Sequence, residues 1–169
     1  MRRLRYIFSL VIALGAVSGA AQAASAQAAA PQAPAVHTQT AVPNALTGRV
    51  TLRDFATRLC LDSDGYGDAY MNDCNGGNYQ KWIVVYSGGL FTFRNDATGL
   101  CLDSDGYGDV YTNDCNGGNY QKWTARASGG NLTLQNRATN LYLDSNENYD
   151  VYTGIGNGGN FQKWFSTPA

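Results

Sequence analysis

Carboxylate, amide and phenol side chains recur in this chain as three copies of one stretch. Residues Cys60 to Trp82 read CLDSDGYGDAYMNDCNGGNYQKW, and Cys101 to Trp123 repeat that string with 21 of 23 positions identical. A third copy from Tyr142 to Trp164, YLDSNENYDVYTGIGNGGNFQKW, matches the second at 14 of 23 positions. Successive copies start 41 residues apart without insertion or deletion, and such a fixed period indicates a repeat architecture. Whatever chemistry these side chains perform is therefore expected three times.

A calcium ion is one ligand that such an acidic loop could hold. Asp62, Asp64 and Asp68 alternate along the loop much as calcium ligands do, and Asp73 lies at the twelfth position. An EF-hand, however, needs a ligand side chain at the fifth position, where Tyr66 stands, a bidentate glutamate at the twelfth, and flanking helices. The third copy also lacks the loop glycines. We expect no bound metal and no cofactor, with structural calcium as the serious alternative.

Catalysis by paired carboxylates is a second possibility. Glycoside hydrolysis needs two carboxylates across one scissile bond, and each copy of the repeat contains several aspartates. An active site is usually one asymmetric arrangement, whereas binding gains from identical copies through avidity. The threefold repetition therefore favours a binding protein without catalytic residues over an enzyme.

Short strands must position these side chains, because no helical pattern of useful length occurs. Each copy holds four strand-like runs separated by Gly- and Asn-rich turns. In the first copy they are Val50–Leu52, Leu59–Asp62, the residues around Tyr70 and the residues that start at Trp82. A β-propeller also uses four strands per repeat but needs at least four blades to close. Three copies instead predict an all-β fold, a β-trefoil of three 41-residue repeats with threefold pseudosymmetry.

The four cysteines lie only in the first two copies. Their even number allows three pairings, and the repeat symmetry favours Cys60–Cys74 and Cys101–Cys115. In the third copy both cysteines of the pair are replaced, by Tyr142 and Gly156. Replacement of both together is what bonding within a repeat would produce. Zinc is the competing explanation, but no paired short Cys-x-x-Cys spacing supports it.

The N-terminal segment has the layout of a secretory signal peptide. A basic start with Arg2, Arg3 and Arg5 precedes 12 apolar residues and several small-residue triplets. Twelve residues are too few to span a bilayer, which takes about 20. We therefore expect a signal peptide over 1–26, a secreted, extracellular protein without membrane insertion, a flexible Ala/Gln/Pro-rich tail over 27–45 and one domain over 46–169. The only histidine, His37, lies in that tail and is expected to be solvated.

Charge and composition narrow the class of partner. Without residues 1–26 the chain loses three arginines and no acids, so its net charge falls from −1 to −4. A nucleic-acid-binding domain needs a basic footprint, so we expect no nucleic acid as partner. Tyr, Asn, Asp and Gly dominate the repeats, and this composition suits polar surface recognition.

The ends of the three copies carry a family resemblance. Gln80-Lys81-Trp82 and its two counterparts form three Gln-x-Trp motifs, each about twenty residues after a Cys-Leu-Asp-like strand. Three such motifs in phase resemble the ricin B-type β-trefoil lectins, over essentially the whole of the predicted domain. The longer pattern of LDS, VYT and NGGNYQKW is similar to the actinohivin-like, three-repeat group of that family. The resemblance implies a non-catalytic lectin with one pocket per repeat, selective for the α1-2-linked mannose ends of high-mannose glycans.

The resemblance also implies the pocket residues. They are Asp62, Tyr70, Asn75 and Tyr79 in copy one, Asp103, Tyr111, Asn116 and Tyr120 in copy two, and Asp144, Tyr152, Asn157 and Phe161 in copy three. Their chemistry fits a sugar, since a carboxylate accepts from two hydroxyls, an amide donates and accepts, and a tyrosine ring covers a C–H patch. Each residue also has a structural alternative: the aspartate and asparagine could set turns, and the first tyrosine could be core. We expect the tryptophans to be core.

The chain departs from the actinohivin-like pattern at one pocket wall. That group has Leu-Pro where this chain has Asn72-Asp73, Asn113-Asp114 and Gly154-Ile155. An apolar wall is thus replaced by an amide or by nothing, which affects the sugar preference more than the lectin assignment. Other sugars of the galactose or xylan type, and a structural or inhibitory trefoil without sugar binding, remain the alternatives. Copy three is expected to be the weakest site, because Phe161 lacks the hydroxyl of Tyr79 and Tyr120.

Overall fold

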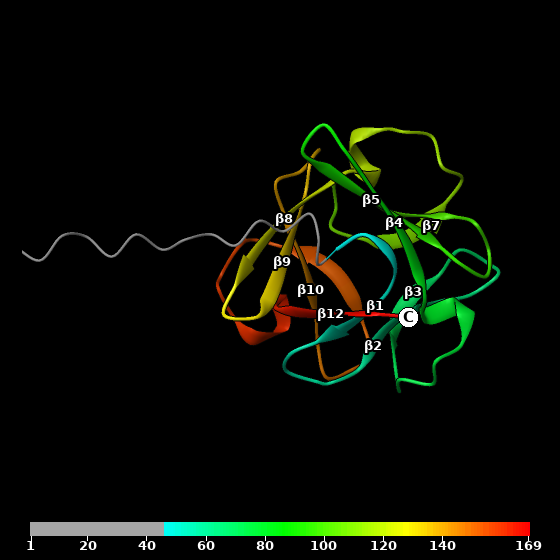
Figure 1. The fold of residues 1–169 in the computed structure, drawn as a ribbon. Helices are drawn as coiled ribbons and strands as arrows, with labels where there is room; N and C mark the ends of the chain where they lie inside the picture. The colour runs from blue at the N-terminus through cyan, green and yellow to red at the C-terminus, as the bar shows by residue number, and fades with distance from the viewer. Residues whose placement is uncertain (1–45) are drawn as a thin grey trace, which may run out of the picture. The chain divides into compact units, whose positions relative to one another are not determined.

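The computed structural model describes residues 46–169, so the predicted signal peptide, the predicted tail and His37 lie outside the described residues. Each copy contributes four strands and one short 3₁₀ helix (Figure 1). Copy one holds β1 (Gly48–Asp54), β2 (Cys60–Ser63), β3 (Ala69–Asn72), η2 (Asn78–Gln80) and β4 (Trp82–Ser87). Copy two holds β5 (Leu90–Asn95), β6 (Cys101–Ser104), β7 (Val110–Asn113), η3 (Asn119–Gln121) and β8 (Trp123–Ser128). Copy three holds β9 (Asn131–Asn136), β10 (Tyr142–Ser145), β11 (Val151–Gly154), η4 (Asn160–Gln162) and β12 (Trp164–Pro168).

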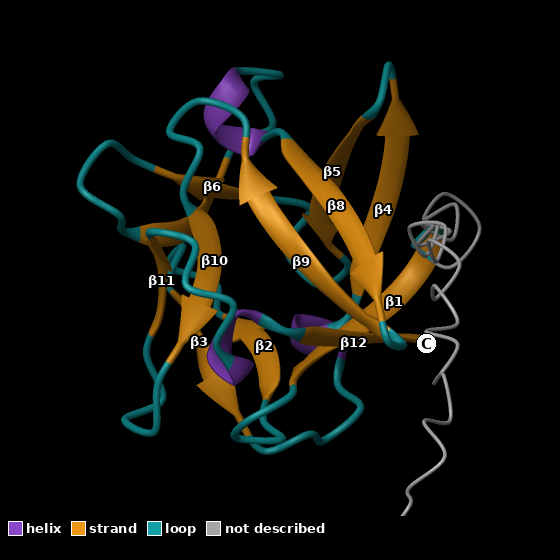
Figure 2. Ribbon diagram, turned by 90° about the vertical axis from the view of Figure 1, so that its left-hand side faces the viewer, coloured by secondary structure: helices purple, strands orange, loops and turns teal. Residues whose placement is uncertain are grey.

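Six of the twelve strands close into a barrel. The first and fourth strands of the copies pair in the ring β1–β4–β5–β8–β9–β12, and β12 returns to β1 (Figure 2). All of these pairs are antiparallel, and because β12 pairs with β1 the ring is closed and has no free edge. The strands fall where the sequence predicts them, and the β-trefoil prediction is confirmed. The 3₁₀ turns were not predicted, and none of the described helices is long and apolar enough to cross a membrane.

Two of the three equivalent barrel junctions are tight hairpins. β4 joins β5 through Gly88-Gly89, and β8 joins β9 through Gly129-Gly130, with positive φ at all four glycines. Positive φ at both central residues is what the favoured type I′ hairpin turn requires. The third junction has no such connection, because there β12 at the end of the domain pairs with β1 at its start over five residue pairs. We call this junction the seam (Figure 1).

The second and third strands of each copy form the hairpins β2–β3, β6–β7 and β10–β11, which pack together as a cap. Backbone hydrogen bonds link the hairpins in a cycle: Thr112 N donates to Gly67 O, Thr153 N to Gly108 O, and Met71 N to Tyr149 O, at 2.7–2.8 Å. Gly67 and Gly108 have φ of 101°, and Tyr149 keeps a positive φ of 69° without being glycine. Each copy therefore donates one cap bond and accepts another, so no hairpin is held by its own copy alone.

The core is built from the same positions in each copy. Trp82, Trp123 and Trp164 are fully buried, and their indole Nε1 atoms donate to the carbonyls of Leu61, Leu102 and Leu143 at 3.1–3.3 Å. Each tryptophan thus satisfies its one polar atom while its ring fills the barrel. The prediction that the tryptophans are core residues is confirmed.

The cysteines pair within copies one and two, as the repeat symmetry predicts. Cys60 is bonded to Cys74 and Cys101 to Cys115, with Cα atoms 5.1 Å apart in each bridge. In copy three the ring of Tyr142 occupies the matching space, so close to Gly156 that a Cβ built there would lie 2.6 Å from the Tyr142 ring. A covalent bond in two copies is therefore replaced by an aromatic ring packed on a glycine in the third.

Candidate functional site

The four residues that the resemblance assigns to copy one meet in one open hollow. Its volume is about 480 Å³, and we call it the copy-one pocket. It lies between the β2–β3 hairpin and the loop that carries η2 and is lined by Asp62, Ser63, Asp64, Gly65, Tyr66, Tyr70, Asn72, Asn75, Gly77 and Tyr79. Residues 17 positions apart in sequence therefore face one small volume, which carries two carboxylates, two amides and three phenol groups.

The carboxylate of Asp62 is buried at the floor of the pocket, with only 3% of the residue exposed. Its Oδ1 accepts the backbone N–H of Ser63 at 2.9 Å. Its Oδ2 accepts the side-chain amides of Gln80 at 2.9 Å and Asn72 at 3.1 Å. Three donors hold this carboxylate in a single orientation, and charge-assisted bonds of this kind are the stronger ones.

Gln80 is the residue that the sequence argument missed. Its side chain is almost fully buried, and its Nε2 donates to Asp62 Oδ2 and to the carbonyl of Asp73 at 2.8 Å. Its Oε1 accepts the backbone N–H of Asn75 at 2.8 Å. One amide thus ties the aspartate, the loop and the asparagine together. The signal was present, because an aspartate and a glutamine recur 18 positions apart in every copy.

Asn75 serves the turn as well as the pocket. Its Oδ1 accepts the backbone N–H of Gly77 at 2.7 Å, and a Cβ at Gly77 would lie 2.9 Å from that oxygen. The alternative that this asparagine sets a turn is therefore correct for its Oδ1 atom. The residue is exposed at the rim of the pocket, so its Nδ2 group remains on the surface.

Two tyrosines form the walls of the copy-one pocket. Tyr70 is half-buried, and its hydroxyl donates a long hydrogen bond of 3.5 Å to the carbonyl of Ser63. Burial, and then the nearby charges of Asp62, Asp64 and Asp68, raise the pKa of Tyr70 above its ordinary value. The phenol therefore keeps its proton at neutral pH and stays a hydrogen-bond donor. Tyr79 stands on the outer side with 45% of its surface exposed, which leaves its ring face open to a ligand.

The acidic loop that suggested calcium is used as a turn. Asp64 Oδ1 accepts the backbone N–H groups of Tyr66 and Asp68 at 2.8 and 3.0 Å. In copy three Asn146, a neutral residue, makes the same two bonds to Asn148 and Asp150. Within 46–169 no three His, Cys, Asp or Glu side chains lie close enough together to hold a metal ion. The turn also carries Tyr66 to the rim of the pocket, where 95% of its surface is exposed.

Copies two and three repeat this arrangement with small differences. Asp103 and Asp144 are buried and accept from Gln121 and Gln162 at 2.9 and 2.8 Å, as Asp62 does from Gln80. The remaining predicted residues, Tyr111, Asn116, Tyr120, Tyr152, Asn157 and Phe161, occupy the positions equivalent to those of copy one. Burial, followed by the charges of the neighbouring aspartates, raises the pKa of Tyr111 and Tyr152 as well.

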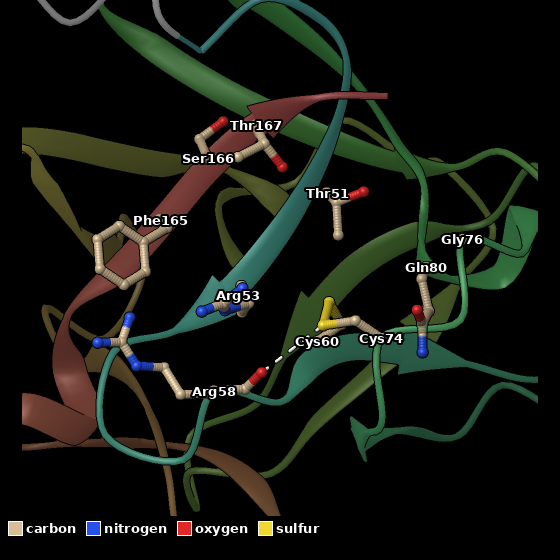
Figure 3. A pocket seen from close by; sticks show the side chains of 10 residues that line it. All are labelled: Thr51, Arg53, Arg58, Cys60, Cys74, Gly76, Gln80, Phe165, Ser166 and Thr167. Atoms are coloured by element: carbon tan, nitrogen blue, oxygen red, sulfur yellow. Dashed lines mark hydrogen bonds between the residues drawn. A yellow bond between two sulfur atoms is a disulfide. The ribbon is translucent and has the colours of Figure 1, made fainter.

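The seam carries a second hollow of about 490 Å³, which the sequence argument did not predict (Figure 3). It is lined by Thr51, Arg53, Arg58, Cys60, Cys74, Gly76, Gln80, Phe165, Ser166 and Thr167. These residues come from both ends of the domain, so no local motif joins them. We call this hollow the seam cavity.

Comparisons with known proteins agree with this geometry. A family model described as the ricin-type β-trefoil lectin domain matches residues 48–165 of the chain. Among curated proteins, none matches the chain by sequence.

Several solved structures share the fold. The designed threefold-symmetric protein ThreeFoil matches with a TM-score of 0.67 at 22% identity, over 72% of this chain and 99% of that protein. SeviL bound to asialo-GM1 saccharide matches with a TM-score of 0.64 at 18% identity, over 73% of this chain and 98% of that protein. The exo-β-1,3-galactanase 1,3Gal43A from Clostridium thermocellum matches with 0.66 at 23% identity, over 73% of this chain but only 30% of that enzyme. Identities this low show a shared fold and nothing finer.

Proposed function

The chain belongs to the ricin-type β-trefoil lectin family, and from that membership we propose that it is a non-catalytic lectin with one glycan pocket per copy. The observation that carries the proposal is the buried aspartate of each copy, held by the glutamine of the same copy. A carboxylate has about four acceptor positions, so Asp62 keeps one beyond its three protein donors for a sugar hydroxyl. Because the carboxylate is already fixed, little ordering entropy is lost on binding.

The surroundings of the aspartate support a sugar rather than another polar ligand. Tyr79 offers an open ring face for the C–H patch of a pyranose, and Tyr70 and Asn75 offer a phenol and an amide at the rim. The acidic floor disfavours anions, and an open hollow suits the end of a glycan chain. A single shallow pocket of this kind binds weakly, and three pockets on one dense glycan raise the avidity by about 100-fold or more.

We further propose mannose-rich glycans as the ligands, because the motif pattern resembles that of actinohivin. The wall at Asn72 differs from that relative, and its amide is already committed to Asp62 at 3.1 Å. The wall is therefore rigid even though it is polar, which supports a defined rather than a broad preference. We also propose that the protein is secreted, which the signal-peptide pattern over 1–26 supports, and N-terminal sequencing of the exported protein tests it.

A glycan array of the mature domain, run with and without EDTA, tests this function. We expect binding to α1-2-linked mannose ends that EDTA does not change. A variant with Tyr79→Ala, Tyr120→Ala and Phe161→Ala should lose array binding while its melting temperature changes little, because these rings lie outside the core and leave the Asp–Gln pairs intact. Loss of binding with EDTA would support the calcium alternative, and unchanged binding by the triple variant would refute the pocket assignment. Binding to galactose- or xylan-type glycans alone would replace the proposed specificity.

A further inference from the structure

The seam cavity differs from the copy-one pocket in the charge of its lining. Its lining holds two arginines, Arg53 and Arg58, together with three hydroxyl side chains, and no carboxylate (Figure 3). Within residues 46–169 the one salt bridge joins Arg49 to Asp96, so neither lining arginine is paired with an acid there. Two uncompensated guanidinium groups at one hollow make a positive potential that favours an anion.

Arg53 has a polar atom that nothing in the described domain satisfies. Its Nε is buried and has no hydrogen-bond partner. Arg53 lies opposite Phe165 in the β1–β12 ladder, and the period of two along β1 turns Arg53 and Thr51 outward while Val50 and Leu52 face the core. A buried N–H without an acceptor is costly, and such groups in native proteins call for an explanation. An acceptor oxygen in the cavity would remove that cost.

The backbone of Arg58 adopts an unusual conformation. Its φ is 66°, in the left-handed region, where the equivalent residues of the other copies are Gly99 and Asn140. Glycine and asparagine adopt that conformation readily, whereas arginine does so with strain. Strain that persists at one copy of a repeated turn is a pointer to function. Its carbonyl lies 3.6 Å from Sγ of Cys74, a close contact only, because a disulfide sulfur has no proton to donate.

Aromatic rings hold the guanidinium of Arg58 in place. Its Cζ lies 5.1 Å from the ring centres of both Phe55 and Phe165, and Arg53 Cζ lies 5.9 Å from that of Phe165. Stacking uses the faces of a guanidinium and leaves its N–H edges free for an acceptor. The other two barrel junctions lack this stacking of arginine on an aromatic ring, because Ile83 and Thr124 stand at the positions equivalent to Phe165.

We propose that the seam cavity binds an acidic saccharide, with its carboxylate or sulfate between Arg53 and Arg58 and its apolar ring face on Phe165. The oxyanion accepts from both guanidinium groups, including the buried Nε of Arg53. The three Asp-floored pockets cannot take this ligand equally well, since their floor is negative. The protein would then bind two chemical classes of sugar, neutral ends in the three pockets and one acidic unit at the seam. This proposal does not depend on the function of the three pockets.

Titration of the full mature chain with methyl β-glucuronide, methyl β-glucoside and inorganic sulfate tests the proposal. The readouts are the dissociation constants and the ¹⁵N-resolved Nε–H signals of the arginines. We expect the glucuronide to bind at least about 10-fold more tightly than the glucoside, since hydrogen bonds to charged groups are the stronger ones, and to shift the signals of Arg53 and Arg58. Added salt should weaken this binding by screening the charges.

The chain supplies matched variants. Arg53→Gln and Arg58→Asn copy the residues of copy three, Gln135 and Asn140, and each should weaken glucuronide binding about 10-fold. Arg94→Gln makes the same change at the equivalent position of copy two and should have no effect. Phe165→Thr, which copies Thr124, should weaken the glucuronide more than sulfate.

The following outcomes would overturn the proposal. They are glucuronide binding no tighter than that of the glucoside, signals of Arg53 and Arg58 that do not shift, or an equal loss in Arg94→Gln. Sulfate binding as tight as that of the glucuronide would refute the saccharide and leave an anion site. Glycan-array binding by the three pockets should survive Arg53→Gln and Arg58→Asn, so failure of one proposal is distinguishable from failure of the other.

Discussion

Copies one and three follow the same backbone path but are braced in different ways. In copy one a disulfide joins Cys60 to Cys74, whereas in copy three the ring of Tyr142 packs against Gly156. A disulfide stabilises mainly by limiting the unfolded chain, while a packed ring acts in the folded state. The two braces therefore show that the link between strand and loop in this repeat need not be covalent.

The pockets of the two copies differ in the same region. In copy one Asn72 donates to Asp62, whereas copy three has Gly154 at this position. A Cβ built at Gly154 would lie 3.4 Å from Asp144 Oδ2. Copy three also has Phe161 in place of Tyr79. The brace and the pocket wall thus changed together in one copy, while the buried aspartate and glutamine did not.

Removal of the disulfide of copy one should have the largest effect on the free energy of unfolding. Cys60→Ala with Cys74→Ala should lower the free energy of unfolding by about 3 kcal/mol, the loop-entropy value for a loop of this length. Chemical denaturation measures it. The control replaces the pair by the residues of copy three, Cys60→Tyr with Cys74→Gly, and should recover part of the loss. No recovery would mean that the ring of copy three depends on other neighbours.

Crowding the brace of copy three should have the next largest effect. In Gly156→Ala the new methyl group would lie 2.6 Å from the ring of Tyr142, so the ring must move. We expect a loss of up to about 3 kcal/mol in the free energy of unfolding, as for other overpacked sites. Gly65→Ala is the control, since no atom lies within 4 Å of that position. Equal effects at the two sites would contradict the packing role of Gly156.

Asp54 of copy one stands at the position that Asn136 occupies in copy three, so the two copies can be compared at this buried site. Asn136 Nδ2 donates to the carbonyl of Tyr120 at 2.6 Å, whereas Asp54 is fully buried with its Oδ2 unpartnered among the described residues. Burial raises the pKa of Asp54 above 3.8, and hydrogen bonds from Thr57 and Ala56 only partly oppose that rise. Asp54→Asn should therefore raise the free energy of unfolding at pH 7 by about 1–2 kcal/mol.

The pH dependence of this variant has a definite sign. A carboxyl with a raised folded-state pKa contributes its stability below the unfolded value of 3.8 and loses it as pH rises through the folded value. The advantage of Asp54→Asn over the wild type should thus be largest at neutral pH and shrink as pH falls toward 4. Denaturation of both proteins across this range measures it, and a constant difference would show that Asp54 does not titrate there.

The smallest expected effect concerns the pocket of copy three. Phe161→Tyr restores the hydroxyl of Tyr79 and Tyr120 and should strengthen that site about 3- to 10-fold, the value of one net hydrogen bond. Titration with a mannose disaccharide measures it. Tyr79→Phe makes the reverse change in copy one and should weaken that site by a similar factor. If neither change alters affinity, the second aromatic residue contributes only its ring.

Much of the fold was predictable because the repeat states it three times. The strand that contains Asp62, the strand starting at Trp82 and the bond between Cys60 and Cys74 all follow from a fixed period. The double role of Asn75, turn and rim, and the lock made by Gln80 did not follow, because both depend on which atoms of one amide face the loop. The seam cavity was beyond sequence reasoning, since Arg53 and Phe165 meet only when the barrel closes.

The seam has a consequence for chain connectivity. Ala169 N donates to Arg49 O at 3.0 Å, so the two ends of the domain already lie side by side. A circular permutant with Ala169 linked to residue 46 and new ends at Gly129-Gly130 should fold to the same barrel, since hairpin loops of this kind tolerate opening. In such a protein the seam becomes an ordinary hairpin junction, and the order of the three copies along the chain loses its meaning for the architecture.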